Sequence, residues 1–413
     1  MLLPANPQNL HALRRSVALV VWPTNDERNI GIMNNDVAVI VGNGLSIAFS
    51  PELKLQTITE NVLERIVDAE GEEVVSAMQK IAQRVLPSGA NTDEDFEVLV
   101  GAFGAESLTL GFLGMLAELT QPDDVRLKES IVEVKKYAEK VRDTGVSHVL
   151  EVITESSNIF SREKENKLDS LMKSIINSFN GKVVISNLNY DTILLNALIR
   201  VCRSELADLA DGRCKSKITV LESGREEEYI VPNLRKDNDF PLLRRVHLLH
   251  LHGSISYWKF DGDNKDGYVK MTKEILNKYN LWKKIRDGEI SIRPVVVLAN
   301  RRDKADHIER YPFDLAYEAF ANSLKCEKWI IVGYSFRDDP VNNMLRSEFL
   351  DRKRENKPRV LVVTYGGELK LRDVEKAFGW GVEDGSSSEW LTINREGASD
   401  MENTEDWVNF VSD

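Results

Sequence analysis

The segment from Val37 to Ser50 reads VAVIVGNGLSIAFS, and it predicts the fold of the rest of the chain. Its first five residues are apolar and mostly β-branched, a composition typical of a buried strand in a parallel sheet. Gly42, Asn43 and Gly44 follow without a spacer, so the backbone can turn tightly there and approach another group closely. In an α/β sheet, nucleotide phosphates usually bind in the crevice beyond such a strand end. Glycine is also common in strand-to-helix turns that bind nothing, so this segment alone leaves both interpretations open.

The composition is that of a globular protein with two or three structural units. The chain has 413 residues, of which 42% are hydrophobic and 29% charged. Its net charge of -12 argues against a generally nucleic-acid-binding surface. The three cysteines, Cys202, Cys214 and Cys326, lack the spacing of a four-cysteine zinc site or a disulfide framework, which favours a cytoplasmic protein. No stretch approaches the roughly 20 apolar residues of a membrane span, so no membrane association is expected.

Strands alternate with helices along the chain, which predicts a Rossmann-like α/β fold with a mainly parallel sheet. Helical periodicity over residues 53–180 is too long for one crossover helix, so we expect a large helical insertion there, with one of its helices beginning at Thr92. We expect an N-terminal arm at residues 1–36, a domain at 37–365 that contains this insertion, and an acidic C-terminal segment at 366–413. After the first strand, further strands are expected at Val183–Ser186, Arg245–His252, Val295–Leu298, Trp329–Val332 and Arg359–Tyr365. The remaining expected elements are a small hairpin at Lys217–Leu221, a charged excursion at 258–290 and a terminal helix at Glu405–Val411.

Four of these strands end in glycine or polar residues. The four sequences are Gly42-Asn43-Gly44, Asn189-Tyr190-Asp191, His252-Gly253-Ser254 and Gly333-Tyr334-Ser335. Because the carboxyl ends of parallel strands lie along one edge of a sheet, all four are expected to converge on one crevice. Such convergence is a stronger indication of a binding site than any one of the turns.

Each of these polar residues has a structural and a functional interpretation. In the structural interpretation, Asn189 makes a turn and Asp191 caps the next helix. In the functional interpretation, Asn189 forms a hydrogen bond to a sugar or a water, and Asp191 fixes the loop. His250 and His252 share a face of their predicted strand, but no third metal ligand is recognisable nearby, so no metal site is expected. A structural role suits His247 and His250, whereas the position of His252 at the crevice suits a general base.

The ordered set GNGLS, NYD, LHGS and GYSFRDD resembles the sirtuin-like family of NAD-binding proteins, over roughly residues 37–365. The resemblance implies that Asn189 and His252 are catalytic, with Asn189 in the nicotinamide-ribose pocket and His252 as the base. The residues that it implies for NAD binding come from three of the four turns: Gly42, Asn43, Gly44, Ser46, Asp191, Gly333, Ser335 and Asp338. Ser335 and Asp338 are also suitable caps for the helix that follows them.

Two departures from the protein-deacylating sirtuins narrow this resemblance. The chain lacks their paired zinc-binding cysteines, and Ala48-Phe49-Ser50-Pro51-Glu52-Leu53 stands where they have a Gly-Ile-Pro-Asp-Phe-Arg segment. In both respects the chain looks like the bacterial antiphage branch, which includes the Thoeris effector and the sirtuin-like subunit that works with a HerA-type ATPase. The resemblance then implies hydrolysis of NAD as substrate, no zinc, a homo-oligomer and a HerA-type ATPase as partner. A deacylase, an ADP-ribosyl transferase and a sensor that binds NAD or an ADP-ribose derivative without turnover are the alternatives.

Overall fold

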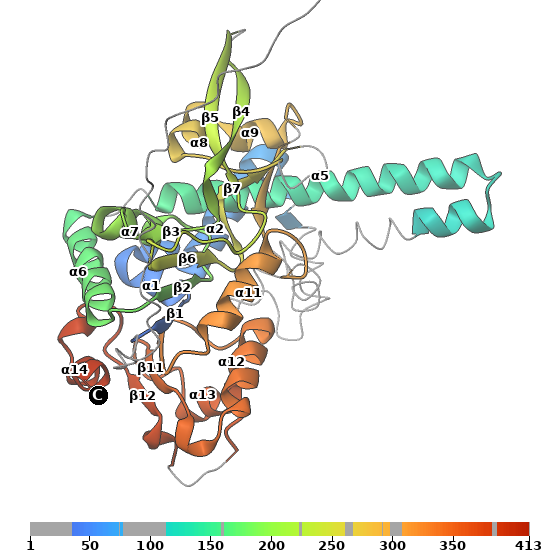
Figure 1. Ribbon diagram of the computed structural model, residues 1–413. Helices are drawn as coiled ribbons and strands as arrows, with labels where there is room; N and C mark the ends of the chain where they lie inside the picture. Colours follow the sequence, from blue (N-terminus) through green and yellow to red (C-terminus); the bar gives the residue numbers. More distant parts are fainter. Residues whose placement is uncertain are drawn as a thin grey trace, which may run out of the picture. The chain divides into compact units, whose positions relative to one another are not determined.

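The computed structural model (Figure 1) describes residues 35–73, 75–76, 113–157, 161–222, 225–260, 267–290, 292–297, 308–381 and 386–412. Residues 1–34 and 35–413 form separate units, and the description that follows concerns the second. The expected N-terminal arm, apart from its last two residues, lies outside the described part of the chain, as does the helix start predicted at Thr92.

A seven-stranded parallel sheet confirms the predicted α/β fold. The order of its strands is β12-β11-β10-β1-β2-β6-β3, and every pairing within it is parallel. The predicted first strand, β1, lies in the middle, with Val37 opposite Lys328 of β10 and Val183 of β2. The strands are β1 (Val37–Val41), β2 (Val183–Asn187), β3 (Leu206–Ala207), β6 (Val246–His250), β10 (Lys328–Val332), β11 (Arg359–Val363) and β12 (Leu391–Asn394).

Helices cover both faces of this sheet, as the all-apolar sequence of β1 requires. Val37, Val39 and Val41 belong to one apolar core, whereas Ala38 and Ile40 belong to the other. The first core includes side chains of α1 (Asn43–Phe49), α2 (Leu55–Glu70), α5 (Val125–Ser156), α6 (Arg162–Ser178), α7 (Ile193–Cys202) and α14 (Glu405–Ser412). The second includes side chains of α11 (Phe313–Ser323), α12 (Asp339–Asp351) and α13 (Leu371–Ala377).

A second, antiparallel sheet is built from strands that lie before and after β6 in the chain, and the sequence analysis did not predict it. Its order is β4-β5-β8-β7-β9. Its strands are β4 (Ala210–Glu222), β5 (Arg225–Leu234), β7 (Gly253–Lys259), β8 (Tyr268–Lys270) and β9 (Arg293–Val296). Gly253 begins β7 with a φ of +84°, and a Cβ there would lie 2.0 Å from the Val295 carbonyl oxygen. The chain therefore reverses directly after His252, and β7 and β9 approach as closely as a glycine allows.

Three predictions about this region are wrong in detail. The strand expected at Val295–Leu298 for the parallel sheet is β9 of the antiparallel sheet. The small hairpin expected at Lys217–Leu221 is the long hairpin of β4 and β5. The charged excursion expected at 258–290 contains β8 and the short helices α8 (Lys273–Lys278) and α9 (Leu281–Arg286).

The C-terminal residues extend the parallel sheet. Leu391 of β12 lies opposite Val360 of β11, and α14 confirms the predicted terminal helix. The sequence analysis expected no strand after Tyr365. Over the part of the chain that is described, none of the helices has the length and apolar character needed to cross a membrane.

Candidate active site

The glycine turns after β1 and β10 lie directly against each other. Gly42 N–H donates to the Val332 carbonyl (3.0 Å), and Gly44 N–H donates to the Gly333 carbonyl (2.9 Å). A Cβ on Gly42 would lie 2.6 Å from the Gly333 oxygen, and a Cβ on Gly44 would lie 2.6 Å from Gly333 Cα. Two of the four predicted turns therefore meet, and both need glycine because their backbones touch.

A substitution at Gly333 tests this close approach. Gly333 has a φ of +63°, and a Cβ on it would lie 2.3 Å from the Leu45 nitrogen. Gly366 has a similar φ of +71° but no atom within 4 Å of such a Cβ, which makes it the matched control. We expect Gly366→Ala to lower the free energy of unfolding by about 1–2 kcal/mol through backbone strain. Gly333→Ala should cost about 1–3 kcal/mol more through overpacking, and equal losses in denaturant titrations would contradict the close approach.

Asn189, Ser46 and Asp191 form one buried hydrogen-bond network beside the first glycine turn. Asn189 Nδ2 donates to the Gly42 carbonyl (3.0 Å) and to Ser46 Oγ (2.9 Å). Ser46 Oγ donates in turn to Asp191 Oδ2 (2.7 Å), and the Ile193 N–H donates to Asp191 Oδ1 (2.9 Å). Burial raises the pKa of Asp191, and these two hydrogen bonds oppose the rise. The network joins the second predicted turn to the first.

This network fixes the orientation of the Asn189 amide. The Gly42 carbonyl can only accept a hydrogen bond, so the atom facing it is Nδ2. Both amide hydrogens are then used within the protein, and Oδ1 is the atom of Asn189 that can accept a hydrogen bond from a water or a ribose hydroxyl. Asn189 is only 6% exposed, so this acceptor is held rigidly.

His252 pairs with Asp338 across the turns after β6 and β10. His252 Nε2 lies 3.1 Å from Asp338 Oδ2, and both side chains are buried. This distance is that of an ion pair when the imidazole is protonated, although Nε2 lacks hydrogen-bond geometry. Asp338 also caps α12, because its Oδ1 accepts from the Val341 N–H (3.1 Å). The ring of Tyr190, next to Asn189 in sequence, lies 6.3 Å from the His252 ring, so His252 adjoins the Asn189 loop.

The predicted strand placement of His252 is wrong. β6 ends at His250, and His252 lies in the turn that leads into β7. The two histidines therefore do not share a strand face. The turn after β6 nevertheless places His252 beside Asp338, which follows β10 in the parallel sheet.

Asn187 supports the Asn189 loop, and the sequence analysis did not single it out. Asn187 Oδ1 accepts from the Asn189 N–H (3.1 Å), and its Nδ2 donates to the Asn189 carbonyl (3.3 Å). Nδ2 also lies 3.5 Å from His250 Nδ1. Asn187 is fully buried as the last residue of β2. The signal in the sequence was an amide side chain at the end of a mainly apolar strand.

Below this loop, His250 makes folding stability depend on pH. Burial lowers its pKa to about 4, from an ordinary value of 6.5. Between these pH values His250 is protonated in the unfolded chain but not in the folded chain. The free energy of unfolding therefore falls as pH drops from about 6.5 to 4. Over that window this group should cost up to about 3 kcal/mol. Denaturant titrations of wild type and His250→Gln should show a stability difference that shrinks as pH falls, whereas a constant difference would contradict a neutral buried His250.

The other predicted site residues have separate surroundings. Asn43 Nδ2 donates to the Leu53 carbonyl (3.2 Å), which ties the start of α1 to the segment after it. Ser335 is exposed, three residues beyond the end of β10. Lys273, at the start of α8, was not predicted: burial lowers its pKa, and the charge of Asp191 opposes that change. Lys273 of α8 therefore lies within electrostatic range of Asp191.

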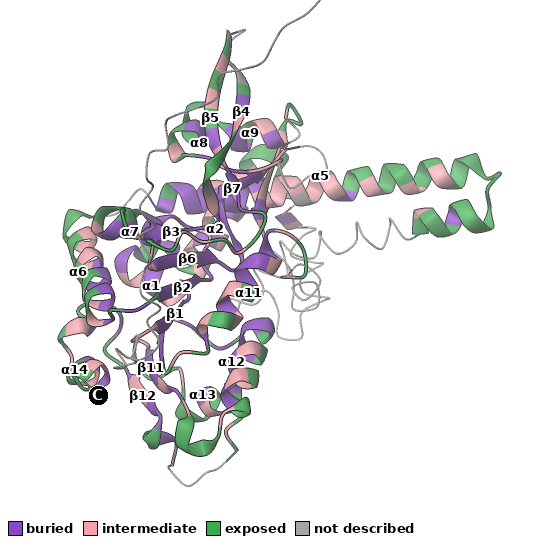
Figure 2. Ribbon diagram, viewed as in Figure 1, coloured by how far each residue is buried: buried purple, intermediate pink, exposed green. Residues whose placement is uncertain are grey.

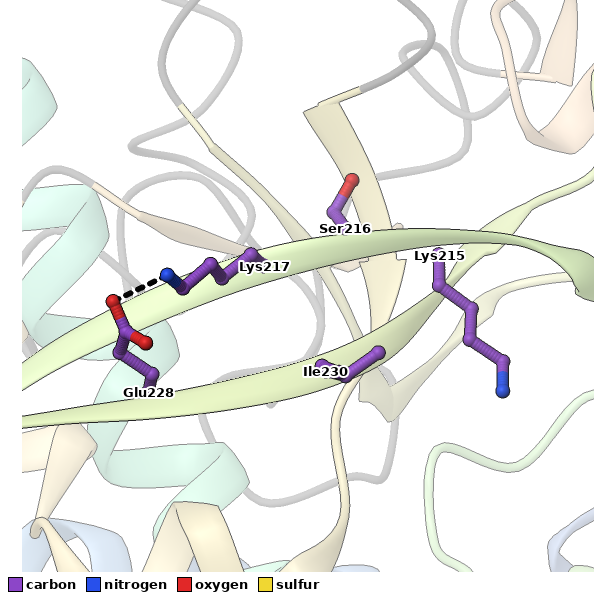
Figure 3. A pocket seen from close by; sticks show the side chains of 5 residues that line it. All are labelled: Lys215, Ser216, Lys217, Glu228 and Ile230. Atoms are coloured by element: carbon purple, nitrogen blue, oxygen red, sulfur yellow. Dashed lines mark ion pairs between the residues drawn. The ribbon is translucent and has the colours of Figure 1, made fainter.

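A surface hollow of about 480 Å³ lies elsewhere, on the hairpin of β4 and β5 (Figure 3). The side chains that line it are Lys215, Ser216, Lys217, Glu228 and Ile230. Across it, Lys217 Nζ forms an ion pair with Glu228 Oε1 (2.5 Å). None of the predicted site residues lines this hollow, so it carries no argument for nucleotide binding.

Comparison with known proteins agrees with the site geometry. Residues 183–380 match the family described as the SIR2-like domain. The match includes Asn189, His252 and Asp338, and Asn189 reaches Gly42 and Ser46 outside it. A search of curated proteins finds no matching relative. Residues 183–380 are thus similar to a SIR2-like domain, which supports a place for the chain in the sirtuin-like family and suggests a function related to NAD.

Proposed function

We propose that this protein hydrolyses NAD to nicotinamide and ADP-ribose. The observation that carries the proposal is the fixed amide of Asn189, whose Nδ2 is held by Gly42 and Ser46 beside the turn that bears His252, which faces Asp338 on the turn after β10. A hydrolase of this kind needs an acceptor to orient a water and a base to take its proton. Asn189 Oδ1 and His252 supply these two functions.

The reaction breaks the bond between the nicotinamide nitrogen and C1′ of the ribose. The electron pair of that bond moves to the pyridinium ring, so nicotinamide leaves as a neutral molecule and needs no acid. The ribose passes through an oxocarbenium-like transition state, as in other glycoside cleavages. Water, oriented by Asn189, forms the new bond to C1′, and its proton passes to His252. Asp338 beside Nε2 favours the tautomer with the proton on that nitrogen, which leaves Nδ1 as the basic atom.

The biological role in this proposal is depletion of cellular NAD in the cytoplasm during antiphage defence. The sequence departures from protein-deacylating sirtuins support hydrolysis over deacylation, and they support a site that needs no zinc. An uncontrolled NADase would harm its own cell, so we place its activity under the control of oligomerisation or a HerA-type ATPase.

NAD labelled in its adenosine half separates this proposal from its alternatives. The full chain is incubated with the label, alone and with a HerA-type ATPase. A hydrolase releases nicotinamide and labelled ADP-ribose in equal amounts, whereas an ADP-ribosyl transferase leaves the label on protein. Tight binding of NAD without nicotinamide under either condition would overturn hydrolysis and favour a sensor.

Asp338→Asn tests the pairing with His252 separately from the fold. Asparagine is as good a helix cap as aspartate, so α12 should keep its start and the protein its stability. Loss of the charge beside Nε2 should lower kcat by about 10-fold to 100-fold, less than the roughly 10²–10⁴-fold lost with a general base itself. Asp339→Asn, at the exposed neighbouring position, is the matched control and should turn over NAD like wild type. The same kcat in both variants would remove Asp338 from the mechanism.

A further inference from the structure

Exposed apolar side chains concentrate in one part of the helical region between β1 and β2. Of seventeen exposed large hydrophobic residues among those described, nine lie between Leu113 and Tyr137. They belong to the helical residues 113–120 and to the N-terminal half of α5, which Figure 2 shows as mainly exposed. The C-terminal half of α5 is buried instead, with Val149 and Leu150 at 0% exposure in the core. Apolar surface gathered in this way is typical of an interaction site.

Part of this surface forms a stripe along α5. Three of these exposed apolar residues, Leu127, Val134 and Tyr137, lie on one face of the helix. The polar Ser130 and the partly buried Val141 complete the spacing of three and four residues on that face. Val134 is 52% exposed and Tyr137 is 70% exposed. This spacing is the heptad pattern by which two helices pack along their length.

The charges of the same half of α5 select the direction of packing. Within the stripe, residues 127–133 contain one more acidic than basic side chain, and residues 134–141 contain two more basic than acidic ones. Two copies of the helix that pack antiparallel bring each acidic part against a basic part, whereas parallel packing sets like charges against each other. A two-fold axis also maps one stripe onto the same stripe of a second copy, which is how most homodimers form.

We propose that this stripe, residues 127–141 of α5, packs antiparallel against the same stripe of a second copy of the chain. In the register that the heptad spacing favours, Val134 lies against Tyr137 of the second copy, and Tyr137 against its Val134. The same register sets Glu133 beside Lys140 of the second copy, twice by symmetry. The proposal does not depend on the reaction that the site catalyses.

The test compares two valines on opposite faces of α5 in the full-length protein. Val134→Asp puts a charge into the stripe, and Val132→Asp puts the same charge at an equally exposed position on the other face, since these valines are 52% and 50% exposed. Sedimentation velocity over a dilution series should show that Val134→Asp halves the mass of the wild-type assembly and that Val132→Asp leaves it unchanged. A monomeric wild type, or equal masses for both variants, would overturn the proposal. A loss of stability in Val134→Asp without a change in mass would assign the stripe to contacts within one chain and overturn it as well.

Charge reversal tests the antiparallel register without touching the apolar residues. Glu133→Lys and Lys140→Glu should each weaken association by roughly 10-fold, because each change affects two symmetric pairs. The double variant restores opposite charges in the antiparallel pair and should recover the wild-type dissociation constant. Additive weakening in the double variant would contradict this register.

Discussion

Asn189→Ala is expected to reduce nicotinamide release from NAD by about 10²-fold or more, because a water that is no longer oriented toward C1′ reacts slowly. The substitution also removes hydrogen bonds to the Gly42 carbonyl and Ser46 Oγ. Leaving those buried groups without a donor should cost about 1–3 kcal/mol of stability. Turnover is therefore measured at a temperature where both proteins are folded, with steady-state kinetics that separate kcat from KM.

Asn394→Ala is the matched control for this change. Asn394 is also buried, and it also makes two hydrogen bonds: Nδ2 donates to Asp406 Oδ2 (3.1 Å) and Oδ1 accepts from the Glu396 N–H (3.1 Å). It is the last residue of β12, two strands away from β10 in the sheet. We expect a similar loss of stability without a loss of kcat. If both variants lose activity in proportion to stability, Asn189 has only a structural role.

His252→Ala is expected to lower kcat by about 10²–10⁴-fold, the usual contribution of a general base. Its control is His247→Ala, which removes a histidine of comparable burial from β6. His247 stacks on Phe240 with 4.4 Å between ring centroids and contacts the Arg244 carbonyl through Nε2 (2.8 Å). Its loss should cost stability and leave turnover intact. Equal kcat values for the two histidine variants would exclude His252 as the base.

The sequence predicted those parts of the fold that depend on a few neighbouring residues. β1 and its glycine turn follow from five buried apolar residues and from backbones that touch at Gly42, Gly44 and Gly333. The antiparallel sheet was not predictable in the same way, because the chain turns at one positive-φ glycine, Gly253, within a continuously buried stretch. β12 is four residues long with only its end residues buried, which is too short for a periodic signal.

Some features of the candidate site were likewise predictable from local sequence, and others were not. The polar and glycine residues after the strands predicted that Gly42, Asn189 and Gly333 lie at one edge of the sheet, because the carboxyl ends of parallel strands share that edge. The contact between His252 and Asp338 joins turns 86 positions apart by number, and no local pattern specifies such a pair. Asn187 was missed because a strand-end amide is ordinarily read as a turn residue, whereas here it holds the backbone of Asn189 on both sides.

The most direct test of the account is the amount of nicotinamide that the full chain releases from NAD, measured alone and with a HerA-type ATPase, and in the variants Asn189→Ala and His252→Ala. The account predicts equal amounts of nicotinamide and ADP-ribose from wild type, and release near background from both variants. Unchanged release in both variants, or binding of NAD by wild type without any release, would contradict it.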